Sequence, residues 1–119
     1  MSRTAWERKA PDFYWKQNDT APSIAEQLVD GNGAAVVLTG ATVKFMAWIP
    51  GQATAKVNAT ATVDDAATGK VSYAPIAADT DTVCDMMAEW QVTFSSPTRI
   101  ETFPNSGWQK IRVVDDIAA

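Results

Sequence analysis

The sequence predicts an all-β fold, an antiparallel β-sandwich of seven to nine strands. Two observations lead to this prediction. Three segments alternate apolar and polar residues with a period of two, and turn-forming residues divide the chain into short pieces. A period of two places every second side chain on the same face of a strand. Many short strands separated by turns are typical of two packed antiparallel sheets.

The alternating segments are residues 41–49, 53–63 and 86–94. In residues 53–63, alanine and valine occupy the odd positions, with threonine, lysine and asparagine between them. Alanine favours helices, but the alternation and the β-branched valine and threonine favour a strand. Residues 41–49 and 86–94 repeat the pattern with larger apolar side chains. The residues expected to share one core are Val43, Phe45, Trp90, Val92 and Phe94.

Turn signals set the remaining strand boundaries. Clusters of glycine, proline, asparagine, aspartate and serine supply the backbone angles that turns require. The predicted strands cover residues 12–17, 22–29, 34–38, 41–49, 53–63, 70–74, 86–95, 98–103 and 108–114. We expect one helical turn at most, between Ile76 and Met87, where Asp79 or Asp81 would be its N-cap.

The chain of 119 residues fits one domain, which we place at residues 11–116 after a basic N-terminal arm at residues 1–10. The arm contains Arg3, Arg8 and Lys9, whereas the whole chain has a net charge of −4. The acidic body argues against a nucleic-acid surface, which requires clustered lysine and arginine. We interpret the arm as a docking tail, and the alternative is a frayed terminus.

The composition also argues against most catalytic and metal sites. The chain has no histidine and a single cysteine, Cys84, so the commonest general base is missing and no intramolecular disulfide can form. Aspartates between residues 64 and 85 lack the spacing of a calcium loop, and turns and caps are their expected use. No apolar run approaches the ~18 residues of a membrane span. We expect a non-enzymatic protein without metal or cofactor that binds neither nucleic acid nor membrane.

Tryptophan is abundant, with five residues in the chain, and strand parity separates a core tryptophan from a surface one. Trp90 shares the parity of the apolar residues on its segment, so we expect it in the core. Trp48 has the polar parity beside Met46, and such residues are enriched where a partner covers them. The alternative is a second packing layer formed by the N-terminal arm folding back. Trp6 lies outside every predicted strand and either packs on its own domain or inserts into a neighbour. The predicted interface residues are Arg3, Trp6, Arg8, Lys9, Met46 and Trp48.

Several stretches resemble a known family. They are Asp19-Thr20-Ala21-Pro22-Ser23-Ile24, the turn Asp30-Gly31-Asn32-Gly33, the run from Leu38 to Phe45, Asp79-Thr80-Asp81-Thr82, and Glu101-Thr102-Phe103-Pro104-Asn105. Together they resemble the β-sandwich at the N-terminus of the baseplate upper protein of tailed phages of Gram-positive hosts. The resemblance runs from about Pro11 to Val114. It implies an immunoglobulin-like β-sandwich that attaches a larger protein or fibre to the distal end of a phage tail.

The resemblance further implies a virion structural protein, made in the host cytoplasm, that docks on other virion proteins as a tail or baseplate accessory or adaptor subunit. We expect it to be homo-oligomeric or present in many copies per particle. The coiled-coil or receptor-binding portion usual in the family does not follow, because the chain stops at Ala119. A capsid decoration or head-fibre protein is therefore an alternative. A lectin-like carbohydrate-binding module is the second alternative, because a shallow sugar site needs only an exposed tryptophan and a few polar groups.

Overall fold

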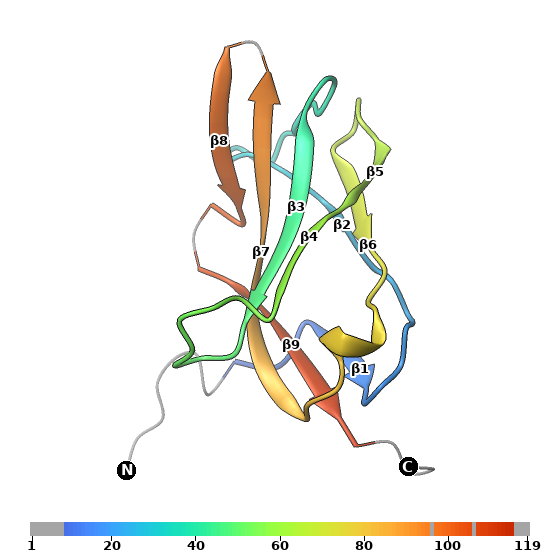
Figure 1. Ribbon diagram of the computed structural model, residues 1–119. Coiled ribbons are helices and arrows are strands. Elements are labelled where there is room, and N and C mark those ends of the chain that lie inside the picture. The colour runs from blue at the N-terminus through green and yellow to red at the C-terminus, as the bar shows by residue number, and fades with distance from the viewer. Residues whose placement is uncertain (1–8, 96, 106, 116–119) are drawn as a thin grey trace.

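The computed structural model describes residues 9–95, 97–105 and 107–115 and consists of two β-sheets packed face to face (Figure 1). The larger sheet contains β1 (Phe13–Lys16), β3 (Thr42–Trp48), β4 (Val57–Thr60), β7 (Cys84–Ser95), β8 (Thr98–Phe103) and β9 (Gln109–Val114). The smaller sheet contains β2 (Ile24–Gln27), β5 (Thr62–Asp65) and β6 (Lys70–Tyr73). The predicted all-β sandwich is confirmed.

Strand β7 organises the larger sheet. Its 12 residues pair with β3 along one edge. Along the other edge, the first part of β7 pairs with β9 and the second part with β8. In Figure 1, β8 and β9 therefore lie at opposite ends of the same long strand. Positions on β3, β8 and β9 share one outer surface because they are all in register with β7.

The pairing of β1 with β9 is parallel, in contrast to the antiparallel pairs elsewhere in the described sheets. Phe13 lies opposite Ile111, and Trp15 lies opposite Val113. Nearly the whole chain connects these two strands, so no hairpin turn imposes an antiparallel direction on them. The sandwich prediction did not anticipate this parallel edge.

The prediction of one strand at residues 53–63 was wrong. The segment is a loop as far as Lys56, then forms β4, and then crosses to the smaller sheet as β5. The N–H of Ala61 donates to the carbonyl of Val43 at 2.8 Å, which is the last backbone bond to the larger sheet. Val57 and Ala61 are both buried. The alternation therefore continues across the break because both pieces face the same core from opposite layers.

Two smaller predictions also need correction. Residues 34–38 form no strand, and a single bridge between Val29 and Ala35 replaces it. The helical turn exists as the 3₁₀ helix η1 (Ala77–Asp79), but its N-cap is Ile76 rather than an aspartate. The carboxylate of Asp79 accepts hydrogen bonds from the Ile76 N–H and the Tyr73 hydroxyl. Asp79 is buried and stabilises the turn through these two hydrogen bonds.

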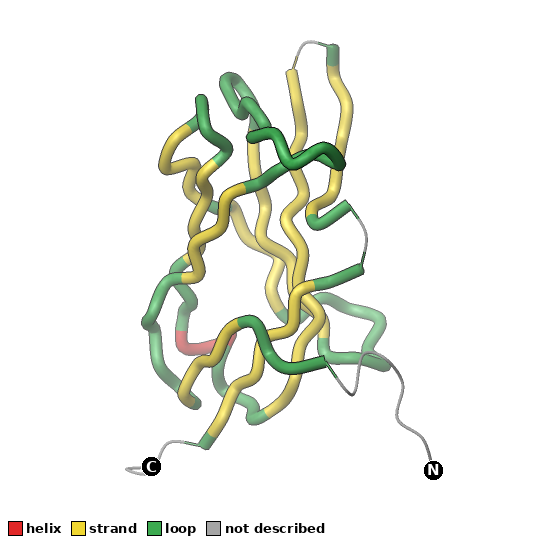
Figure 2. The backbone as a smooth tube through the Cα atoms, turned by 180° about the vertical axis from the view of Figure 1, so that it is seen from behind, coloured by secondary structure: helices red, strands yellow, loops and turns green. Residues whose placement is uncertain are grey.

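The core lies between the two layers, which Figure 2 shows from behind. All five predicted core residues are buried, so that prediction is confirmed. The Phe45 ring stacks on Tyr73 of the smaller sheet with centroids 4.9 Å apart, and meets Trp90 edge-on at 4.8 Å. Burial, together with the bond to Asp79, raises the pKa of Tyr73 far above its ordinary value. The aromatic contacts therefore join the two sheets through an uncharged phenol.

Candidate functional site

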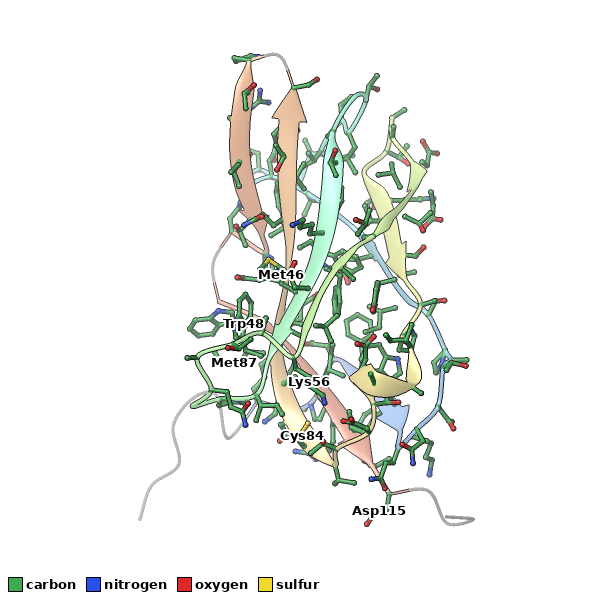
Figure 3. All side chains as sticks on the ribbon, viewed as in Figure 1. Met46, Trp48, Lys56, Cys84, Met87 and Asp115 are labelled. Atoms are coloured by element: carbon green, nitrogen blue, oxygen red, sulfur yellow. The ribbon has the colours of Figure 1, made fainter. Side chains whose placement is uncertain are left out.

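The outer face of the larger sheet changes in character along its strands. Side chains directly opposite on neighbouring strands lie on the same face. Moving along β3, the outward pairs with β7 are Thr42 with Thr93, Lys44 with Gln91, Met46 with Glu89, and Trp48 with Met87. The first two pairs are polar, and three of the four side chains in the last two are large and apolar. Figure 3 shows Met46, Trp48 and Met87 gathered at this end of the sheet.

A groove of about 300 Å³ lies at the apolar end of this face, between the end of β3 and the residue before β9. We call it the tryptophan groove. The residues that define it are Trp48, Ile49, Pro50, Gly51, Gln52, Met87, Glu89 and Trp108. Trp48 is half-buried, and Trp108 is 47% exposed. The groove thus presents two indoles and a thioether to the solvent, next to Met46.

Glu89 is the acidic group of the tryptophan groove. It is half-buried, and burial raises the pKa of its carboxyl above the ordinary value. Within the described part of the chain, no hydrogen bond or ion pair reaches the Glu89 carboxylate. A carboxylate that loses water without gaining a partner costs free energy. The groove therefore combines apolar walls with one uncompensated negative charge.

We expect Glu89→Gln to raise the melting temperature at pH 7. Because the pKa of Glu89 is higher in the folded state than in the unfolded state, the charged form penalises folding above the folded-state pKa. The penalty disappears below the unfolded value of about 4.3, so the gain should vanish there. Thermal unfolding of both proteins across this pH range measures the effect. Asp64→Asn removes the same charge from an exposed site, and an equal gain there would show that net charge, not burial, is responsible.

The N-terminal segment reaches the same groove. Lys9 Nζ donates to the carbonyl of Trp108 at 2.8 Å and pairs with the Asp12 carboxylate at 2.9 Å. The Asp12 N–H donates to the Lys110 carbonyl, and the Lys110 N–H donates to the Asp12 carboxylate, both at 2.7 Å. Residues 9–12 are therefore attached along the beginning of β9, beside Trp108.

The structure places Lys9, Met46 and Trp48 near the same end of the outer face, as three of the predicted interface residues. Arg3, Trp6 and Arg8 lie outside the described residues. Sequence reasoning missed Met87, Glu89 and Trp108. Met87 and Glu89 have the outward parity of the alternating segment at 86–94, and that parity was the signal available. Trp108 precedes its strand, and no periodicity indicated where it would lie.

An ion-pair network borders the tryptophan groove. Arg112 binds Asp85 through Nε at 2.8 Å and Nη2 at 3.2 Å, and Lys110 Nζ lies 3.6 Å from the same carboxylate. The Arg112 guanidinium lowers the pKa of Asp85 below its ordinary range. Elsewhere, Asp30 and Asp65 accept turn N–H groups, and Asp81 pairs with Lys56. These aspartates serve turns and ion pairs, and the described residues contain no cluster of three potential metal ligands.

A second cavity, of about 260 Å³, opens between β2 and the loop that follows β8. Its polar groups bond to one another. Trp90 Nε1 donates to Gln109 Oε1 at 3.1 Å, and Gln109 Nε2 donates to Glu26 Oε2 at 2.8 Å. This chain of bonds connects the two sheets. Because Trp90 is fully buried, its ring offers no platform to a ligand, and the tryptophan groove is the better candidate site.

No protein-family model and no curated protein matches the sequence. Among solved structures, the chain is similar to the N-terminal domain of phage TP901-1 ORF48, a baseplate protein. The TM-score is 0.60, and the match covers 92% of this chain and 91% of that chain at 13% identity. This chain shares the fold of that domain. The expected likeness to the baseplate upper protein domain is thus confirmed for the fold, and at this identity no residue role follows from it.

A helical membrane span is absent from the part of the chain that the structure describes.

Proposed function

We propose that the protein is a non-enzymatic structural component of a tailed-phage virion, a β-sandwich module that docks on other virion proteins. The shared fold with a phage baseplate domain over nearly the whole chain is the observation that supports this setting best. It favours a tail or baseplate accessory or adaptor subunit. The protein is made in the host cytoplasm and is present in several copies in the assembled particle, as a homo-oligomer or as repeated subunits.

The docking surface that we propose is the tryptophan groove together with Met46. A large apolar group exposed to water is a cost that an interface removes. Trp48 and Met87 lie opposite each other on neighbouring strands, so they present one contiguous surface rather than scattered side chains. Aromatic residues and methionine are enriched in the buried centres of interfaces. The basic residues Arg3, Arg8 and Lys9, with Trp6, belong to the same surface in this proposal.

Trp48→Lys tests the docking surface. We expect the variant to fold with a nearly unchanged melting temperature, because Trp48 is only half-buried. We also expect fewer copies of the variant to be incorporated into each particle. An interface tryptophan contributes about 2 kcal/mol or more, roughly thirtyfold in affinity. The measurement is the number of epitope-tagged copies per purified virion, determined by quantitative immunoblotting against the unchanged protein.

Ile100→Lys is the matched control for this experiment. Ile100 is 63% exposed and lies on β8 opposite Thr93, in the polar part of the same outer face. It should therefore be incorporated normally. Normal incorporation of Trp48→Lys would place the docking surface elsewhere, and the loop from Ala77 to Asp85 would be the next region to test.

The position in the virion distinguishes the main proposal from its alternative, a capsid decoration or head-fibre protein. Both roles need only a rigid module with one adhesive face, so the groove is compatible with either. Immunogold electron microscopy of particles that contain the tagged protein separates them. Gold at the tail or its distal end supports the accessory or adaptor role, and gold over the head supports decoration.

A lectin-like role is the second alternative, and the exposed Trp108 beside Gln52 and Glu89 favours it. An indole face next to an amide and a carboxylate offers both the stacking surface and the hydrogen bonds that a sugar ring uses. A glycan array with the purified protein tests this role. Binding that Trp108→Ala abolishes would support it.

A further inference from the structure

Strand β8 is an open edge of the larger sheet. It pairs with β7 along one side (Figure 1), and within the described residues no backbone group of another strand or loop bonds to its other side. With six residues it is the longest edge strand of the described sheets, because β1, β2, β4 and β5 have four residues each. An unpaired edge of this length is a template for another strand.

The sequence of this edge is complementary to itself. Strand β8 begins Thr98-Arg99-Ile100-Glu101-Thr102. When two copies of the strand run antiparallel about Ile100, Arg99 of each copy lies opposite Glu101 of the other. Ile100 then lies opposite its own copy, and Thr98 lies opposite Thr102. Opposite charges and paired threonines stabilise neighbouring strands when they lie directly across from each other.

The charges select this register over its neighbours. The two residues of every pair are an even number of positions apart along β8, so their backbone groups face the same side, as an antiparallel ladder requires. Registers centred on Arg99 or on Glu101 also meet this condition. Each of them places two like charges directly opposite each other, which destabilises the pairing. The register centred on Ile100 is therefore the favoured one.

Both charged side chains are available for such a contact. Within the described residues, neither Arg99 nor Glu101 forms an ion pair. The Arg99 guanidinium lies over the Phe94 ring, 4.1 Å from its centroid, and Glu101 Oε2 accepts a hydrogen bond from Asn105 Nδ2 at 3.2 Å. Ile100 between them is 63% exposed. Pairing would give each charge an opposite partner and would cover the isoleucine with its copy.

We propose that two copies of this chain join through β8, antiparallel about Ile100, so that the two larger sheets become one continuous sheet. The β8 edge lies along the second part of β7, whereas the tryptophan groove lies at the first part, beside Met87. Each copy can therefore dock through its own groove whether or not it is paired. Ile100→Lys weakens the pairing but leaves the docking surface intact, so it remains a control for docking.

The pairing of free chains does not rest on the proposed function, whereas the presentation of two grooves to a virion by one dimer does. The contact is small, so we expect a weak dimer. Sedimentation equilibrium of the purified full-length chain at concentrations up to about 1 mM covers the range of such complexes. A chain that stays monomeric throughout this range would overturn the proposal.

Charge exchange tests which residues make the contact. Arg99→Glu and Glu101→Arg should each raise the dissociation constant of the dimer roughly tenfold or more, because each change turns two attractive pairs into repulsive ones. An equimolar mixture of the two variants should dimerise again, because every pair across the contact then joins opposite charges. Unchanged dimerisation of the single variants, or a mixture that stays monomeric, would contradict pairing through β8.

Disulfide formation tests the register. Cys84→Ser removes the only cysteine of the chain, and Ile100→Cys, Thr98→Cys and Thr102→Cys are then introduced singly. Directly opposite residues of an antiparallel pair have Cα atoms about 4.5–5.5 Å apart, within the range of about 4.4–6.8 Å for disulfides. Under mild oxidation, Ile100→Cys should give covalent dimers, and the two threonine variants should do so only when mixed with each other.

Equal yields of covalent dimer from the three single variants would overturn the register, because they would show random collision. The yields are read from non-reducing gels of the purified protein. Neither these gels nor the sedimentation measurements need a virion partner, so their failure is distinct from normal incorporation of Trp48→Lys, which would overturn the docking surface.

Discussion

Replacing Trp90 with alanine should lower the free energy of unfolding by about 3–5 kcal/mol. The side chain is fully buried, meets the Phe45 ring at 4.8 Å and donates to Gln109. Alanine leaves a cavity between the sheets and a half-buried Gln109 carboxamide oxygen without its donor, and both effects destabilise the fold. The loss is a large part of the 5–15 kcal/mol typical of a whole domain.

Denaturant unfolding, followed by circular dichroism, measures this loss. Trp108→Ala is the matched control, because it removes the same side chain from a position that is 47% exposed. Its cost should stay below about 1 kcal/mol, as at other surface sites. Similar losses for the two variants would mean that Trp90 does not occupy the core position that strand parity predicted for it.

Gly69→Ala should cost about 2–5 kcal/mol, although the residue lies in a turn. Gly69 has a φ of +70°, and a Cβ there would lie 2.7 Å from the Val36 carbonyl oxygen and 2.8 Å from that of Leu28. Its own carbonyl accepts the Leu28 N–H at 2.8 Å. The Gly69 turn is therefore packed against the backbone of the segment that follows β2. The two carbonyl groups belong to the backbone, so neither can move aside as a flexible side chain would.

Gly33→Ala separates the two causes of this loss. Gly33 has a φ of +82°, but a Cβ there would meet no atom within 4 Å. Alanine at position 33 therefore incurs only the cost of the left-handed backbone, about 1–2 kcal/mol, without the steric clash. Chemical denaturation of both variants gives the difference, which is the cost of the clash. Equal losses would show that the segment from Leu28 to Val36 is not packed on Gly69 in solution.

Local pattern was sufficient for the fold class and for much of the core. The period of two in residues 41–49 and 86–94 placed Phe45 and Trp90 inside, because alternate side chains of a strand point to opposite faces whatever the strand pairs with. The same parity placed Met46 and Trp48 on the outer face, where the groove lies. These features depend on neighbours along the chain, so the sequence alone determined them.

Long-range pairing decided the rest. The alternation in residues 53–63 continues without interruption although the segment changes sheets, because both sheets face the same core. The alternation therefore does not indicate which sheet a strand joins. The parallel pair of β1 with β9, the clash that makes Gly69 necessary, and the meeting of Trp108 with Trp48 and Glu89 all join segments far apart in the sequence. Their positions depend on how the two sheets pack and on the register of β7, so only the tertiary structure brought the walls and the charge of the groove together.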